Sequence, residues 1–232
     1  MSETSVLTSP TLNDHKPVVA ESEAVFSLPA ISVHLEAATA DSDVDVDLRQ
    51  YISAYKSLNE IFPLLGRLFS FVHSDIASKV TILESHLAST TSEHFRSVGS
   101  MLSYEKDNDL FLNDAKFTNG SRTLLRLHRA LEFIAEFISG IIDCDDDHAS
   151  TAQIANAAYD RTLSKFHPWL VRKAVHVAVH TLPYRKQLIE NLRGDVDESE
   201  IMPTMKRAVQ LCHLVYNRVQ VMYEEKGLLD LP

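Results

Sequence analysis

The fold is decided by residues 64–87, LLGRLFSFVHSDIASKVTILESHL. Apolar residues recur in this stretch every three or four positions, which predicts an amphipathic helix. At about 100° per residue, the apolar arc centres on a line through Leu68 and Phe71, and two charged residues, Asp75 and Lys79, fall inside it. A charge on a buried face is costly unless it has a partner. The pair therefore indicates either a polar site set against an apolar interior or a structural i,i+4 ion pair at the rim of the core.

Outward from this stretch, the pattern predicts helices joined by short loops, and we expect an all-α fold. The sequences Thr90-x-x-Glu93 and Ser150-x-x-Gln153 fit capping boxes at two helix starts, and Gly227 fits a helix end. The expected helices cover about 27–38, 47–88 with a kink or break near Pro63 and Gly66, 91–106, 121–142, 151–165, 168–192 starting at Pro168 and bending at Pro183, and 200–226.

The composition favours one globular domain with an acidic N-terminal tail. The chain has 232 residues, of which 45% are hydrophobic, and this suffices for a sizeable core. The net charge of -10 arises mainly near the N-terminus, because residues 1–48 hold nine acidic residues and one basic residue, Lys16. Residues 1–24 are rich in Ser, Thr and acids and lack periodicity, so we expect a disordered tail followed by a single domain over 25–232. Such a tail should bind neither nucleic acid nor anionic membranes.

Several classes of protein are excluded by motifs that the sequence lacks. No glycine-rich loop of the nucleotide-binding kinds is present. The two cysteines, Cys144 and Cys212, form no CxxC motif, which favours a reduced protein of the cytoplasm. No apolar run reaches the roughly 20 residues needed to span a bilayer. The N-terminus lacks the basic start and apolar block of a signal peptide.

Two further segments carry chemistry. Residues 122–133, RTLLRLHRALEF, place arginines on the helix face opposite an apolar stripe. This face is open to two interpretations, a solvated surface with i,i+3 and i,i+4 ion pairs or an arginine site with Phe133 beside it. The second segment is His167-Pro168-Trp169, which opens a helix. His167 fits a structural N-cap, and Trp169, the sole tryptophan, fits either the core or an exposed interfacial anchor.

Taken together, three motifs resemble the glycolipid transfer protein superfamily, and within it the ceramide-1-phosphate transfer proteins. The motifs are Asp75-x-x-x-Lys79, Arg122-x-x-x-Arg126-Leu-x-Arg129 and His167-Pro168-Trp169. Their order and spacing make the set specific, and the similarity extends from about Phe26 to the C-terminus. The resemblance implies a two-layer sandwich of helices that encloses lipid chains in an apolar pocket.

The resemblance also implies a role for each motif residue. The aspartate, here Asp75, accepts hydrogen bonds from the amide N–H and a hydroxyl of a sphingolipid, and the histidine, here His167, donates to the amide carbonyl. Lys79, Arg122 and Arg126 hold the phosphate in phosphate-selective members. In members that bind sugars, the position of Arg126 is typically Trp and that of Lys79 is Asn. This chain departs from the sugar pattern at both positions, which favours a phosphate headgroup.

Physical chemistry agrees with this implied site. Lys79, Arg122 and Arg126 supply three positive charges and Asp75 one negative charge, which nearly balances a phosphomonoester of about -1.5 to -2. Arginine suits bidentate phosphate contacts. An ionised aspartate only accepts hydrogen bonds, so it favours a lipid with N–H and O–H donors over a diacyl glycerolipid.

The expected function is therefore transfer of ceramide-1-phosphate between membranes without vesicles. Moving a 16-carbon chain through water exposes apolar surface worth roughly 13 kcal/mol, at about 0.8 kcal/mol per CH₂. A protein that shields the chain lowers this barrier without covalent chemistry, so we expect no catalytic residue, no cofactor and no metal. We expect a monomer that contacts membranes transiently through Trp169, because tryptophan favours the membrane interface.

Three other interpretations remain open at this stage. The pair His176-x-x-x-His180 places two imidazoles on one helix face, as in metal sites, but no acidic third ligand is evident near the pair in the sequence. A sphingolipid sensor or adaptor would bind the same lipid and act through a protein partner. A helical interaction module would bind no lipid at all.

Overall fold

The computed structural model describes residues 26–111 and 118–231, so the tail expected over residues 1–24 lies outside the described residues. The described parts contain helices and no β-strand, which confirms the all-α prediction. The α-helices are α1 (Leu28–Ala38), α2 (Leu48–Asn59), α3 (Ile61–Leu65), α4 (Ser70–Leu87), α5 (Val98–Asp107), α6 (Gly120–Asp143), α7 (Thr151–Arg161), α8 (Trp169–Val179), α9 (Arg185–Arg193) and α10 (Ile201–Lys226). Short 3₁₀ helices are η1 (Arg67–Phe69), η2 (Ser92–Phe95) and η3 (Ser164–Phe166).

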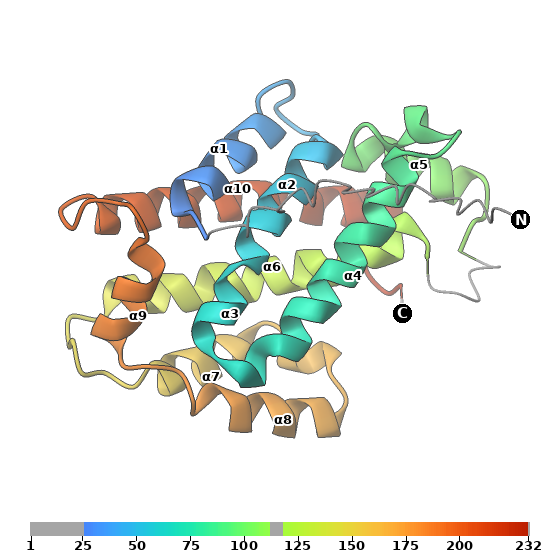
Figure 1. The fold of residues 1–232 in the computed structure, drawn as a ribbon. Helices are drawn as coiled ribbons and strands as arrows, with labels where there is room; N and C mark the ends of the chain where they lie inside the picture. Colours follow the sequence, from blue (N-terminus) through green and yellow to red (C-terminus); the bar gives the residue numbers. More distant parts are fainter. Residues whose placement is uncertain (1–25, 112–117, 232) are drawn as a thin grey trace, which may run out of the picture.

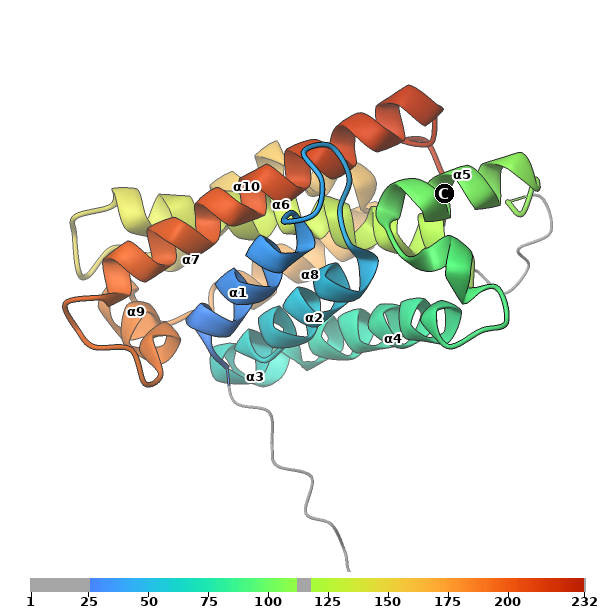
Figure 2. The same ribbon diagram turned by 90° about the horizontal axis from the view of Figure 1, so that it is seen from above.

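The helices form two layers, as expected. In one layer α1 packs on α2 and α2 on α4, and in the other α10 packs on α6, α6 on α7 and α7 on α8. The layers meet where α1 lies on α10 and α4 on α6. In Figure 1 the helices α1–α4 lie in front of α10 and α6, and the view from above in Figure 2 separates the two sets.

The core fills the space between these layers, and buried tyrosines tie the layers and helices together. Tyr55 of α2 donates its hydroxyl hydrogen to the Leu127 carbonyl of α6. Tyr223 of α10 donates to the Ser121 carbonyl, with a distance of 2.6 Å between the oxygens. Both bonds end on α6, whose apolar face is buried along its whole length. The central helix is therefore held from both sides.

The long helical region expected over 47–88 is broken in the structure. The chain leaves α2 at Asn59, makes the single turn of α3 and passes Gly66 before η1 and α4. Gly66 has φ 105°, a conformation that residues with a Cβ avoid. Pro63 sits in the first turn of α3, where its missing N–H costs nothing. The expectation of a break near both residues is confirmed.

One predicted helix start, that of α5, is wrong. The helix expected from residue 91 begins at Val98, with Ser97 and Ser100 forming the capping box in place of Thr90 and Glu93. The Asp45 carboxylate, distant in sequence, accepts hydrogen bonds from Ser97 Oγ at 2.6 Å and Gly99 N at 2.9 Å. This tertiary contact fixes the start of α5.

Three further boundaries also differ from the sequence pattern. Ser150 is the N-cap of α7, but its side chain accepts no cap hydrogen bond, and α7 ends at Arg161, short of residue 165. The helix expected over 168–192 is split, because α8 ends at Val179 and α9 begins at Arg185. Pro183 lies between them and separates two helices, where a bend within one helix was expected.

Candidate functional site

The N-terminus of α6 is fixed by a buried carboxylate. Glu105 of α5 accepts hydrogen bonds from Gly120 N at 2.8 Å and Ser121 N at 2.7 Å, and so neutralises part of the positive helix end. A Cβ at position 120 would lie 2.8 Å from Met101 Sδ and 3.0 Å from Glu105 Oε1. A side chain at position 120 would therefore force the Met101 side chain to shift. The arrangement sets the first turn of α6, which carries Arg122.

The arginines of α6 are more buried than a solvated face would be. Arg122 is only 7% exposed, so the interpretation of this face as solvated is wrong at that position. Arg126, one turn later, is partly buried. Arg129 donates from Nη2 to the Leu229 carbonyl at 2.6 Å. Burial, and then the charge of Arg126, lower the pKa of Arg129.

Asp75 and Lys79 form an i,i+4 ion pair on α4, one of the two alternatives for these charges, with 2.5 Å between Lys79 Nζ and Asp75 Oδ1. The expectation that both charges are buried is wrong for Asp75, whose side chain is 64% exposed, whereas that of Lys79 is 14% exposed. The apolar arc is wider than the surface that neighbouring helices cover. The buried stripe of α4 runs through Ile76, Val80 and Leu83. Asp75 lies about a quarter turn away from it, beside the exposed Leu68 and Phe71.

His167 lies close to this ion pair, although it is distant in sequence. It follows η3 and precedes Pro168, the N-cap of α8, so the prediction of His167 as the N-cap is wrong by one residue. Burial lowers the pKa of His167, the Asp75 charge raises it and the Lys79 charge lowers it again. His167 Nδ1 lies 2.8 Å from the Tyr159 hydroxyl of α7. The structure therefore places His167 within electrostatic reach of Asp75 and Lys79, and the three residues come from two separate segments.

Two residues that the sequence did not indicate complete the surroundings of the site. Tyr159 is buried and contacts His167 through its hydroxyl. Phe166 lies under the Arg129 guanidinium, 3.9 Å from its carbon to the ring centroid, and joins η3 to α6. Phe166 is adjacent to the histidine in sequence, which is the only signal that could have indicated it. For Tyr159 no periodicity or motif distinguishes it.

Exposed apolar side chains surround the segment after His167. The Trp169 side chain is not in the core, because the residue is 64% exposed, and Leu170 and Val177 of the same helix are exposed as well. Leu64, Leu68 and Phe71 form a second exposed apolar group at the α3–α4 turn. Both α8 and this turn lie along the lower edge of the molecule in Figure 1. Nearby charged residues in the 165–173 segment are basic: Lys165, Arg172 and Lys173.

An apolar cavity lies between the layers. Its volume is about 30 Å³, and it is bordered by α1, α2, α3, α6, α9 and α10. The residues that line it are Phe26, Leu28, Ile31, Leu58, Ile61, Ile134, Ala135, Ile138, Leu192, Ala208, Val209 and Cys212. At about 10–15 Å³ of such volume per water molecule, this space is far smaller than an acyl chain.

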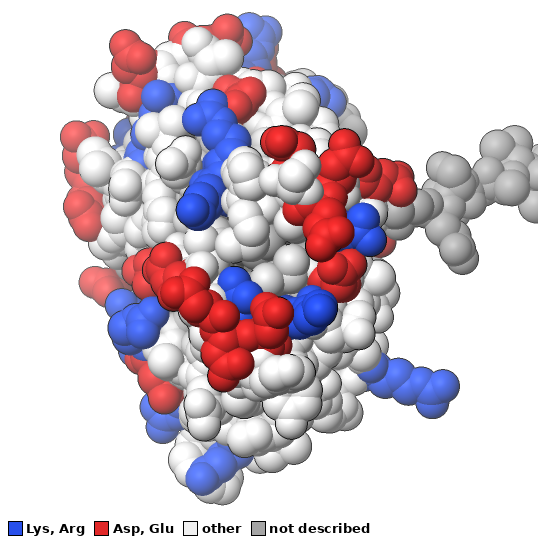
Figure 3. Space-filling model, turned by 90° about the vertical axis from the view of Figure 1, so that its left-hand side faces the viewer, with Lys and Arg blue, Asp and Glu red and all other residues white. Residues whose placement is uncertain are grey.

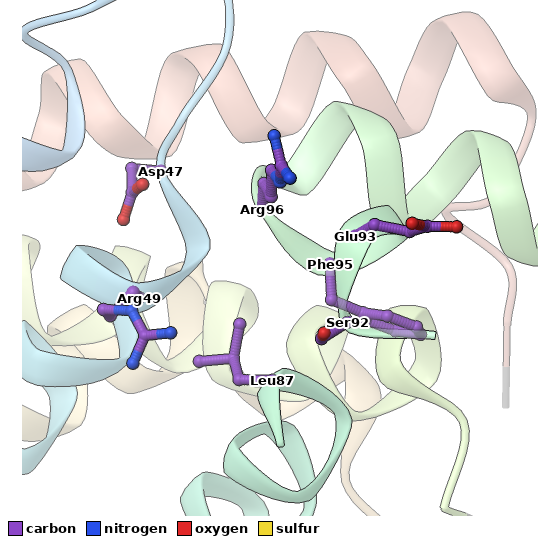
Figure 4. Close-up of a pocket in the computed structure, with 7 residues that line it drawn as sticks. All are labelled: Asp47, Arg49, Leu87, Ser92, Glu93, Phe95 and Arg96. Carbon is purple, nitrogen blue, oxygen red and sulfur yellow. The ribbon is translucent and has the colours of Figure 1, made fainter. Parts of the chain in front are cut away.

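A wider cavity of about 450 Å³ lies elsewhere, between the start of α2 and η2. Figure 4 shows its lining, which mixes carboxylates with guanidinium groups: Asp47, Arg49, Leu87, Ser92, Glu93, Phe95 and Arg96. No residue of the candidate site lines it. The Asp47 carboxylate is already engaged there as the N-cap of α2.

The described residues offer neither a cluster of metal ligands nor a membrane-spanning helix. No group of three or more His, Cys, Asp or Glu side chains in residues 26–111 and 118–231 could hold a metal ion. His176 Nδ1 lies 2.7 Å from Asn156 Oδ1, so this imidazole is engaged with α7. Over the same ranges, no helix has both the length and the apolar character to span a bilayer.

Comparison with known proteins identifies the fold. The family model described as glycolipid transfer protein matches residues 46–194. The chain belongs to the glycolipid transfer protein family. The matched range contains all of Asp75, Lys79, Arg122, Arg126 and His167.

Several similar proteins in this family share one name, ceramide-1-phosphate transfer protein. The ceramide-1-phosphate transfer protein of Xenopus laevis is 36% identical over 217 residues, which are 92% of this chain and 100% of that protein. The human protein of the same name is 35% identical over 215 residues, 91% of this chain and 99% of its own. The crystal structure of the human protein in complex with 2:0 ceramide-1-phosphate has a TM-score of 0.82 and 34% identity, covering 90% of this chain and 100% of that one.

Proposed function

We propose that this protein transfers ceramide-1-phosphate between membranes by shielding the lipid during its passage through water. The observation that carries the proposal is the charge of the candidate site. It has three positive side chains, Lys79, Arg122 and Arg126, and one negative side chain, Asp75. Relatives at about one-third identity over nearly their whole length are ceramide-1-phosphate transfer proteins, which supports the same ligand here.

The two members of the α4 ion pair would bind different parts of the lipid, Lys79 the phosphate and Asp75 the sphingoid chain. A phosphate entering beside Lys79 competes with Asp75 for the ammonium group. The released carboxylate only accepts hydrogen bonds, so it pairs with the amide N–H and the hydroxyl of the sphingoid chain. A diacyl glycerolipid with the same phosphate offers no such donors and leaves Asp75 without a replacement partner. The exposure of Asp75 suits this role, because the headgroup arrives from the surface.

The lipid chains require more room than the interior offers in this conformation. A cavity of about 30 Å³ lies between the layers. We infer that the chains enter there as the two layers separate, because its lining is apolar and comes from both layers. The polar residues would then hold the headgroup at the end of this opened space.

Docking onto the membrane is assigned to α8 and the α3–α4 turn. Trp169 and Leu170 are exposed there, and Lys165, Arg172 and Lys173 suit an interface with lipid headgroups. Figure 3 shows a different face, which carries the loops 143–150 and 194–200 and gathers acidic side chains, whereas its lower part is mostly uncharged. The acidic face should point away from the bilayer. We propose that the protein acts as a monomer in the cytoplasm, where free Cys144 and Cys212 stay reduced.

The decisive test is a transfer assay between donor and acceptor vesicles with ceramide-1-phosphate, a phosphatidic acid and a neutral glucosylceramide of equal chain length. We expect rapid transfer of ceramide-1-phosphate and little of the other two lipids. Efficient transfer of glucosylceramide would overturn the phosphate assignment. Tight binding without transfer would instead favour a sensor that acts through a protein partner, and extraction of no lipid by the protein would favour a plain interaction module.

A further inference from the structure

Tyr159 of α7 contacts the candidate site through His167. Its hydroxyl oxygen lies 2.8 Å from His167 Nδ1. The tyrosine is 1% exposed, and its ring is held edge-on by Phe133, with 6.1 Å between ring centroids, and by His176, at 5.8 Å. The hydroxyl therefore has a fixed position, and the histidine ring is fixed through it.

The direction of this hydrogen bond follows from the surroundings of the tyrosine. Burial raises the pKa of the Tyr159 phenol, so the phenol keeps its proton near neutral pH. Burial lowers the pKa of His167, so its imidazole is neutral and carries one N–H. In the described parts of the chain, the Tyr159 hydroxyl has no acceptor other than His167 Nδ1. A buried hydroxyl that donates to no acceptor is costly. Tyr159 therefore donates to Nδ1, and the imidazole proton resides on Nε2.

We infer that Tyr159 is a positioning residue, which holds His167 as the Nε2–H tautomer and presents this N–H to the ligand. The inference rests on the proposed function for the identity of the acceptor, the amide carbonyl of a sphingolipid. It explains why a tyrosine outside the recognised motifs belongs to the site. The hydrogen bond selects which ring nitrogen donates, and a wrong tautomer would present a lone pair to the carbonyl oxygen.

The charges of α4 make this selection necessary. Asp75 and Lys79 both act on the imidazole, with opposite effects on its pKa. A carboxylate attracts an N–H, so a ring released from Tyr159 would divide its proton between the two nitrogens or turn toward Asp75. Either change removes the donor from the ligand while the fold persists.

The first experiment measures the tautomer without any lipid. Nitrogen-15 NMR of the histidine-labelled full chain at neutral pH distinguishes protonated from unprotonated ring nitrogens, and His167→Gln assigns the His167 signals. We expect Nδ1 unprotonated and Nε2 protonated in the unmodified protein. In Tyr159→Phe we expect the two tautomers to be mixed or inverted. A proton on Nδ1 in the unmodified protein, or an unchanged tautomer in Tyr159→Phe, overturns the inference whether or not the proposed function holds.

The second experiment links the tautomer to the ligand. Tyr159→Phe should bind ceramide-1-phosphate about three- to tenfold more weakly, the loss typical of one neutral hydrogen bond. Its affinity for sphingosine-1-phosphate, which lacks the amide carbonyl, should not change. Tyr104→Phe is the matched control, because Tyr104 also lies against a histidine, His94, but on α5. Equal losses for both lipids in Tyr159→Phe would reduce the tyrosine to a structural role and overturn the inference. If the unmodified protein binds neither lipid, the proposed function fails and the NMR result alone decides on Tyr159.

Discussion

The polar site and the apolar cavity differ in how far each is formed in this structure. On α4 a carboxylate and an ammonium group lie 2.5 Å apart, with a histidine held nearby by a buried tyrosine. Between the layers, the apolar side chains leave only about 30 Å³. Under the proposed function, the polar groups would hold the headgroup where they now lie, whereas the space for the chains would first have to open.

This difference separates recognition of the lipid headgroup from accommodation of the lipid chains. Hydrogen-bonding groups need fixed positions, because an incorrectly placed donor is worth little. An apolar pocket that stayed open to water would expose its lining at about 25 cal/mol per Å². Closing it keeps the protein stable between deliveries. We expect substitutions in the polar site to change which lipid is bound, and substitutions in the cavity to change how easily chains enter.

The largest expected effect follows from replacing the carboxylate of the polar site. Asp75→Val should reduce ceramide-1-phosphate transfer by about a hundredfold or more, because two hydrogen bonds to a charged acceptor are lost at about 1.5–3 kcal/mol each. The fold should persist, since the Asp75 side chain is mostly exposed. Vesicle transfer and circular dichroism measure the two quantities. Glu84→Val is the control, because it removes another carboxylate of α4 that pairs with a lysine, Lys56. Normal transfer by folded Asp75→Val would remove Asp75 from the site.

The second effect concerns the headgroup charge. Arg126→Leu should weaken ceramide-1-phosphate binding by about 1.5–3 kcal/mol, roughly ten- to 150-fold, since one charged hydrogen-bonding group is lost. Equilibrium binding to the purified protein measures it. Arg161→Leu serves as the control, because it removes an arginine that pairs with Glu136 on the surface. Equal affinities of the two variants would contradict a phosphate contact at Arg126.

Much of the fold was predictable because it depends on local patterns. The apolar stripe of the helix expected over 121–142 agrees with α6, whose N-cap is Asn119. The break at Gly66 follows from the conformational freedom of glycine. By contrast, the start of α5 depends on Asp45, which is more than 50 residues away from Ser97. A capping pattern shows which side chains could cap a helix, but tertiary contacts decide which one does.

The candidate site was predictable to a similar extent. The spacing of Asp75 and Lys79 places them on one helix face, and the structure joins them in an ion pair. The pattern gave no information on which part of the apolar arc a neighbour covers, so the burial of Asp75 was predicted incorrectly. The contact between Tyr159 and His167 joins residues eight positions apart across the end of α7 and η3. Their roles in lipid binding stay predictions.

A substitution in the cavity tests the other half of the comparison. Ala208→Phe should slow transfer of ceramide-1-phosphate with a 16-carbon chain about tenfold, because the added ring fills the space where chains enter. It should also destabilise the fold by about 1–3 kcal/mol through overpacking. Binding of an analogue with two short chains should stay within about twofold, since the polar site is untouched. The control Leu214→Phe adds similar bulk to an exposed position of α10. If Ala208→Phe weakened the short-chain analogue as much as the long-chain lipid, the cavity would belong to the headgroup site, and the distinction between cavity and polar site would be wrong.

The smallest expected effect concerns Trp169 on the proposed docking surface, which belongs to neither the polar site nor the apolar cavity. Trp169→Ala should slow transfer about three- to tenfold while leaving the affinity for a soluble short-chain ceramide-1-phosphate unchanged, because the exposed indole contributes to docking and not to the site. Val44→Ala, at another exposed apolar position, is the control. Since Trp169 is the sole tryptophan, its fluorescence in the unmodified protein reports on docking without a label and should shift to the blue when vesicles are added. An unshifted spectrum with vesicles that support transfer would move the docking surface away from α8. The α3–α4 turn would then be the docking surface, because its exposed Leu68 and Phe71 lie beside Asp75 and would bring the site to the bilayer.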